Sequence, residues 1–308
     1  PADADSFNGT VVVEWLNVSG GIEAAPDWVF GHVQLIRAGA AWVGVSVQKA
    51  GIDGGGGLLG IADLSLKSVN PARYGSLVHP GDSFSYDIFT QVGTVVRTPG
   101  AVRPLGDLQP KIVLGVGESQ SAFRMVNYIN AIQPMTHTFD GFLVHSRGDG
   151  NLAPISQSPQ ADIPTPAGTL IRDDQDVPVL MLQTETDLTF LASFGIRQPD
   201  TKHYRLWEVA GTAHADTYTV VRGFADTGTD PAVVQPLIIA DPLPGIISCA
   251  QPINDGPQHF AVKAAFAALE RWVKRGKPPR PQPRLEVSAG PPVAILRDTL
   301  GNGRGGIR

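Results

Sequence analysis

The stretch that decides the fold is KIVLGVGESQSAFRMVNYINAI, residues 111–132. Residues 111–117 form a nearly continuous apolar, β-branched run, which predicts a buried strand. Residues 119–132 are predicted to form a helix. Between the two stands Gly117-Glu118-Ser119-Gln120-Ser121, which fits the pattern of a nucleophile elbow, a tight strand-to-helix turn that lifts a serine above a sheet. A serine stands where a second glycine is usual, but it is still small. The alternative is a serine that merely caps an ordinary helix.

Outward from this stretch, apolar runs alternate with helical patterns. Several of the runs are nearly continuous and do not alternate between apolar and polar residues, as strands buried on both faces require. The alternation of strands and helices predicts an open α/β sheet, in which ligands bind beyond the carboxyl ends of the strands. Strands are predicted over residues 10–16, 41–47, 111–117, 139–146, 177–183 and 203–209, and helices over 26–38, 119–132 and 259–275.

A serine at its ordinary pKa needs a base, and His214 is the best placed of the seven histidines. It follows the predicted strand 203–209 within a run of small residues. His259, at the start of the last helix, is the remaining alternative for the base. A carboxylate must hold the histidine in one tautomer. Asp187 follows the strand 177–183 after a short turn, and Glu185 in the same turn is the alternative acid.

The order Ser119, Asp187, His214 is the order found in α/β-hydrolases and differs from the orders on other folds. The developing oxyanion needs two N–H donors. The first is expected from Gln120, the residue after the nucleophile. The second is expected from Asn17 or Val18, in the small, glycine-containing loop after the first strand. Glu118 beside the serine either tunes its surroundings or forms an ordinary ion pair.

Composition excludes several other classes of protein. The chain has 308 residues with 24 Lys and Arg against 29 Asp and Glu, a net charge of −5, and no basic stripe that would bind nucleic acid. No apolar run reaches the about 18 residues of a membrane span. The pair His214 and Asp216 has no second ligand cluster at metal spacing, so no metal and no cofactor are expected. The single cysteine, Cys249, is expected to be structural and buried. Cell location and oligomeric state stay open.

One catalytic domain is predicted over residues 1–308, with one unusual segment. Residues 149–176 are rich in Pro, Ser, Gln and Asp and show no period. Long segments of this kind are typical of lids and insertions, and the alternative is a surface excursion with no role. Residues 51–60 are glycine-rich and predicted to form a loop.

The motifs together resemble a bacterial family of α/β-hydrolase domain-containing proteins with carboxylesterase-like members. The likeness runs through FNGTVVVEWLNVSGG, GVGESQSAFRMVNYINAI, FDGFLVHSRG, TETDL and WEVAGTAHAD. It implies an α/β-hydrolase fold: a mostly parallel central sheet with helices on both faces and the Pro-rich, lid-like insertion 149–176.

The resemblance also implies ester hydrolysis without a cofactor, with Ser119 and His214 carried over by motif and Asp187 alongside them. It implies that family members extend further at both ends, so the chain is expected to be truncated there. The same triad would also serve an amidase or lactonase. A non-catalytic binding protein of the same fold is the alternative from another class.

Overall fold

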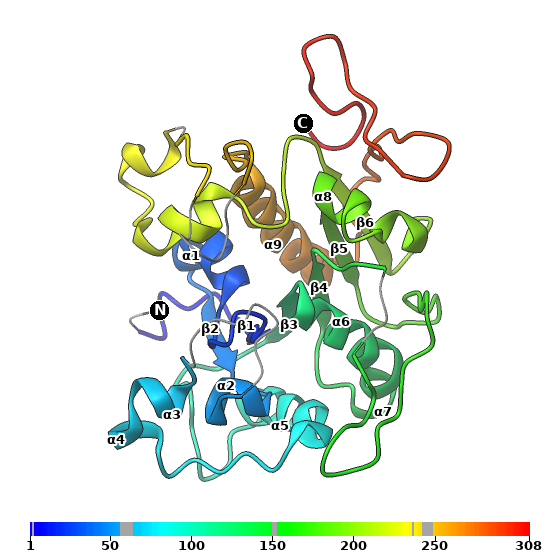
Figure 1. Cartoon of the computed structure of the whole chain (residues 1–308). Helices are drawn as coiled ribbons and strands as arrows, with labels where there is room; N and C mark the ends of the chain where they lie inside the picture. The colour runs from blue at the N-terminus through cyan, green and yellow to red at the C-terminus, as the bar shows by residue number, and fades with distance from the viewer. Residues whose placement is uncertain (2, 56–63, 150–152, 236, 242–248) are drawn as a thin grey trace.

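The computed structural model describes residues 1, 3–55, 64–149, 153–235, 237–241 and 249–308. Among these residues, six parallel strands form one sheet in the order β2-β1-β3-β4-β5-β6 (Figure 1). This confirms the predicted α/β-hydrolase fold class. The strands are β1 (Thr10–Trp15), β2 (Ala41–Val45), β3 (Ile112–Glu118), β4 (Gly141–His145), β5 (Val179–Thr184) and β6 (Tyr204–Val209).

Helices enclose the sheet on both faces. Among the described residues they are α1 (Pro26–Ala38), α2 (Lys49–Asp53), α3 (Leu66–Val69), α4 (Pro71–Tyr74), α5 (Ser85–Arg97), α6 (Gln120–Asn127), α7 (Gln133–Thr136), α8 (Glu185–Thr189) and α9 (Gln258–Arg275). The predicted helix over residues 119–132 is α6 followed by a π-helical turn, Tyr128–Ile132. The prediction of a loop over residues 51–60 was wrong for residues 51–53, which form the end of α2, and its residues 56–60 lie outside the described residues.

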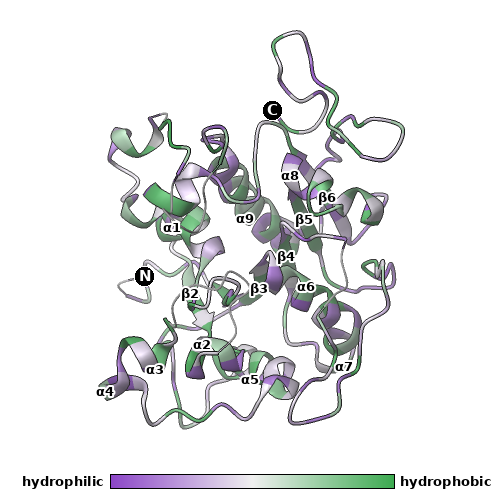
Figure 2. Cartoon of the chain, in the orientation of Figure 1, coloured by the Kyte–Doolittle hydropathy of each residue, from purple (hydrophilic) through white to green (hydrophobic). Residues whose placement is uncertain are grey.

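The side chains of alternate residues on each strand pack into two separate hydrophobic cores, one on each face of the sheet. On β3, for example, Val113 packs in one core, with side chains of α5 and α6, while Leu114 packs in the other, with α1 and α9. Both faces are therefore covered, and the strands must be apolar throughout. Figure 2 shows this plainly on β4 and β5, which are strongly hydrophobic.

Helix α1 begins at Pro26 and ends before Gly39, as predicted. Gly39 takes a left-handed conformation with φ of 73°, which glycine adopts at little cost. Ile36 on this helix is apolar but 63% exposed. Helix α9 packs so closely on Gly31 that a Cβ there would lie 2.4 Å from the ring of Phe266. Ile36 lies about 140° around the helix from Gly31, at 3.6 residues per turn, and so faces outward.

The described residues of the Pro-rich segment are Asp149 and residues 153–176, and the start of the second range contacts α5 and α6. Tyr86 and Arg124 both donate to the carbonyl oxygen of Pro154, each at 3.2 Å. Asn127 donates to the carbonyl oxygen of Ala153 at 2.5 Å. These contacts attach the start of the segment to α5 and α6, and its role as a lid stays a prediction.

A second excursion, which the sequence patterns did not predict, joins β6 to α9. Its described residues contain only short helical turns, such as the π-helical turn Tyr218–Arg222. Cys249 lies in this excursion and is exposed, so the expectation of a buried cysteine was wrong. No helix among the residues that the structure describes is long and apolar enough to cross a membrane.

Candidate active site

The predicted elbow is a sharp turn between β3 and α6. β3 ends at Glu118, α6 begins at Gln120, and Ser119 between them has φ of 55° and ψ of −118°. A non-glycine residue in this region is strained, by about 1–3 kcal/mol, and such residues cluster at functional sites. The neighbours must be small: a Cβ on Gly117 would lie 3.1 Å from the Ser121 backbone carbon.

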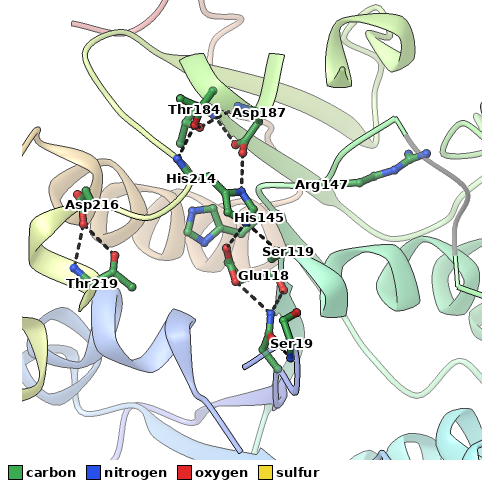
Figure 3. Close-up of polar contacts among 12 residues, drawn as sticks. Ser19, Glu118, Ser119, His145, Arg147, Thr184, Asp187, His214, Asp216 and Thr219 are labelled. Atoms are coloured by element: carbon green, nitrogen blue, oxygen red, sulfur yellow. Dashed lines mark hydrogen bonds and ion pairs between the residues drawn. The ribbon is translucent and has the colours of Figure 1, made fainter. Parts of the chain in front are cut away.

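Three side chains that are far apart in the sequence meet at the carboxyl end of the sheet (Figure 3). The Oγ of Ser119 lies 2.8 Å from Nε2 of His214. The Nδ1 of His214 lies 2.7 Å from Oδ1 of Asp187. The serine comes from the turn after β3, the acid from α8 directly after β5, and the histidine from the loop after β6. This is the geometry in which an imidazole can accept a serine proton while a carboxylate orients it.

Local contacts fix the two partners of the serine. Asp187 is fully buried and forms a capping box with Thr184, whose backbone N–H donates to Oδ2 of Asp187 at 2.7 Å. The backbone N–H of His214 donates to the hydroxyl of Thr186 at 2.7 Å. One turn of helix therefore holds the acid directly and the histidine through its backbone.

Burial and charge set the protonation of this pair. Burial by itself would raise the pKa of Asp187, but the adjacent His214 and the N–H of Thr184 outweigh it and hold that pKa below its ordinary value. Burial would lower the pKa of His214, but Asp187 and Glu118 raise it to about 9. The carboxylate thus stays ionised and favours the imidazolium form of the histidine.

Glu185, the alternative acid, is not in contact with His214. Its Oε1 accepts from the backbone N–H of Gly211 at 2.7 Å, and its Oε2 pairs with Arg297 at 2.9 Å. His259, the alternative base, stacks on Tyr218 with ring centroids 4.0 Å apart. The structure therefore brings Asp187 and His214 to the serine and engages both alternatives elsewhere.

The two candidates for the second oxyanion donor differ in their backbone contacts. The N–H of Asn17 donates to the carbonyl oxygen of Ala24 at 2.8 Å, in an antiparallel bridge that closes the loop, so this donor is already engaged. Val18 is therefore the better candidate. Gln120 is the first residue of α6, where backbone N–H groups have no partner within the helix.

Glu118 is buried beside the histidine. Its side chain is 8% exposed, and its Oε1 lies 3.6 Å from Nε2 of His214. Burial raises the pKa of this carboxyl to about 7. The side chain of Asn17 donates both to the carbonyl oxygen of Glu118, at 3.1 Å, and to its Oε2, at 3.3 Å.

A second histidine and acid lie close by, and their pairing was not predicted from the sequence. The Nδ1 of His145, at the end of β4, lies 2.9 Å from Oδ1 of Asp27 in α1, and both side chains are fully buried. The Nε2 of His145 contacts the amide of Gln258 at 3.1 Å. Apart from the position of His145 at a strand end, no local signal marks this pair, because Asp27 is distant in the sequence.

The described residues contain no group of three or more His, Cys, Asp and Glu that could hold a metal ion. None of the curated proteins compared with the chain matches it. A family model described as alpha/beta hydrolase domain matches residues 1–308. Since the match covers the whole chain, the protein belongs to the alpha/beta hydrolase domain family.

Proposed function

We propose that this α/β-hydrolase cleaves carboxylic esters through an acyl-enzyme intermediate on Ser119. The observation that carries the proposal is the pair of short contacts from Ser119 to His214 and from His214 to Asp187, at 2.8 and 2.7 Å. A binding protein would gain nothing from a serine held in a strained turn against a carboxylate-bound imidazole. A nucleophile and its base explain this arrangement.

The proposed reaction has two halves. Ser119 Oγ attacks the ester carbonyl while Nε2 of His214 takes its proton, and the tetrahedral oxyanion accepts from the N–H groups of Gln120 and Val18. The imidazolium then protonates the leaving alcohol as the carbon–oxygen bond breaks. In the second half, His214 activates a water molecule that releases the acid and regenerates the serine. Asp187 stays ionised throughout.

A fluorophosphonate probe followed by peptide mapping tests the nucleophile. We expect labelling at Ser119 in the wild type and none in Ser119→Ala or His214→Ala. Loss of such a nucleophile lowers kcat by about 10⁶. Ser121→Ala is the matched control, since Ser121 is a buried serine in the same turn and should leave labelling intact. Near-normal turnover in Ser119→Ala would disprove the assignment.

A matched panel of ester, amide and lactone substrates then tests the bond that is cleaved. We expect turnover of esters to exceed that of the corresponding amides. Faster cleavage of amides or lactones would point to an amidase or lactonase with the same triad. A folded wild type that the probe does not label would favour a binding protein.

A further inference from the structure

The base of the proposed reaction has a carboxylate on each side. Asp187 binds Nδ1 of His214, and Oε1 of Glu118 lies 3.6 Å from Nε2, the nitrogen that faces Ser119. The role proposed above accounts for Asp187. It leaves Glu118 unexplained, although burying a carboxylate is unfavourable unless it gains a partner.

Glu118 is held in this place by the loop after β1. The side-chain amide of Asn17 donates to both the backbone and the carboxylate of Glu118. Asn17 is itself fixed, because its backbone N–H and C=O both pair with Ala24 and its side-chain oxygen accepts from the N–H of Ser19 at 2.7 Å. Figure 3 shows Glu118 between His214 and the loop that carries Ser19. These hydrogen bonds hold the carboxylate of Glu118 in its position beside His214.

We propose that Glu118 is a positioning residue for His214, a second carboxylate that stabilises the imidazolium formed when the histidine takes the proton of Ser119. The proposal rests on the proposed function of Ser119 and His214. Asp187 and Glu118 then flank the positive charge from its two nitrogens. Asn17, whose backbone N–H was a candidate oxyanion donor, contributes instead by holding Glu118.

The groups that face Glu118 come from several elements. His214 and His145 favour its ionised form, while Asp27 and Asp187 oppose it. Because burial outweighs these charges and raises its pKa to about 7, Glu118 carries its charge mainly above that pH. Glu118 and Asp187 in turn raise the pKa of His214. Removing the charge of Glu118 must therefore lower the pKa of His214.

Glu118→Gln tests the proposal, because glutamine keeps the shape and an oxygen that can accept from Asn17 but has no charge. The first readout is the titration of the His214 ring by NMR, assigned with His214→Gln, which does not depend on turnover. The second is the pH dependence of fluorophosphonate labelling. The control is Glu286→Gln, which removes an exposed carboxylate paired with Arg304.

We expect the titration midpoint of His214 to fall by about one pH unit or more in Glu118→Gln, a tenfold change in its acid dissociation constant. The acid limb of Ser119 labelling should move to lower pH with it, while the rate at the alkaline plateau falls about tenfold, equivalent to about 1.4 kcal/mol of transition-state stabilisation. Glu118→Asp should restore part of both effects, and Glu286→Gln should show neither.

An unchanged His214 midpoint in folded Glu118→Gln would overturn the inference, and so would an equal effect from Glu286→Gln. A different outcome is a His214 midpoint that shifts in Glu118→Gln while the probe labels neither the variant nor the wild type. That result would contradict the proposed function but support the charge contact between Glu118 and His214. The two failures are therefore distinguishable.

Discussion

Replacing Asp187 by Asn tests which carboxylate serves the base. Asp187 is fully buried and uses both oxygens: Oδ1 accepts from Nδ1 of His214 and Oδ2 from the N–H of Thr184, each at 2.7 Å. Asparagine has nearly the same shape but only one oxygen. Its NH₂ group must face either the helix cap or the imidazole, and facing the imidazole would favour the wrong tautomer.

The expected loss can be estimated from these contacts. Each of the two hydrogen bonds involves a carboxylate and contributes about 1.5–3 kcal/mol. The imidazolium formed in the transition state also loses its buried counter-charge. The same replacement in the Ser-His-Asp triad of another serine hydrolase lowers kcat by about 10⁴. We therefore expect Asp187→Asn to lower kcat by about 10³–10⁴, equivalent to about 4–5.5 kcal/mol.

Glu185→Gln is the matched control. It changes an acid two residues away on the same short helix, whose contacts are the N–H of Gly211 and a half-exposed Arg297. Neither contact involves His214, so kcat should change by less than about tenfold, equivalent to about 1.4 kcal/mol. Both variants would be assayed on a chromogenic short-chain ester, with circular dichroism to establish folding. A large loss in Glu185→Gln with near-normal Asp187→Asn would refute the assignment of the acid.

Two further predictions concern stability. Ser119→Gly should remove activity but raise the urea midpoint of unfolding, because glycine tolerates the φ of 55° that strains serine by about 1–3 kcal/mol. The greater chain entropy of glycine in the unfolded state offsets about 0.5–1 kcal/mol of this gain. A lower midpoint would contradict the strain argument. The stabilisation that His214 provides should be complete below about pH 6.5 and lost as the pH rises to about 9, because its folded pKa is raised above the ordinary value of 6.5. Urea unfolding of wild type and His214→Gln across this range measures it, and a constant difference between them would contradict the raised pKa.

Much of the fold follows from local sequence. The strand and helix around Ser119 are adjacent in the chain, and the elbow between them requires small residues at fixed spacing, so the pattern could be recognised without tertiary information. Asp187 and His214 could be placed because the carboxyl ends of parallel strands meet at one edge of the sheet. Whether these residues catalyse a reaction stays a prediction.

The parts that could not be predicted depend on contacts between distant segments. The choice between Asn17 and Val18 depends on a backbone hydrogen bond to Ala24, which no side-chain pattern reveals. The pair of His145 and Asp27 joins residues 118 positions apart. The exposure of Ile36 could not be predicted either, because the face that α1 buries is decided by α9, more than 200 residues later in the sequence.

Contacts between distant segments also bring several buried ionisable groups together at the carboxyl end of the sheet, close to Ser119. His145 lies beside Asp27, and the charges of Asp27 and Glu118 raise its pKa. His214 is flanked by Glu118 and Asp187. Acids and bases thus alternate, and Glu118 is shared by both histidines. A buried charge without a partner is strongly unfavourable, so each of these carboxylates needs a nearby histidine. In the proposed reaction, the proton of Ser119 would move to a histidine that already lies against ionised Asp187, joined by ionised Glu118 above about pH 7, so little reorganisation would accompany the transfer.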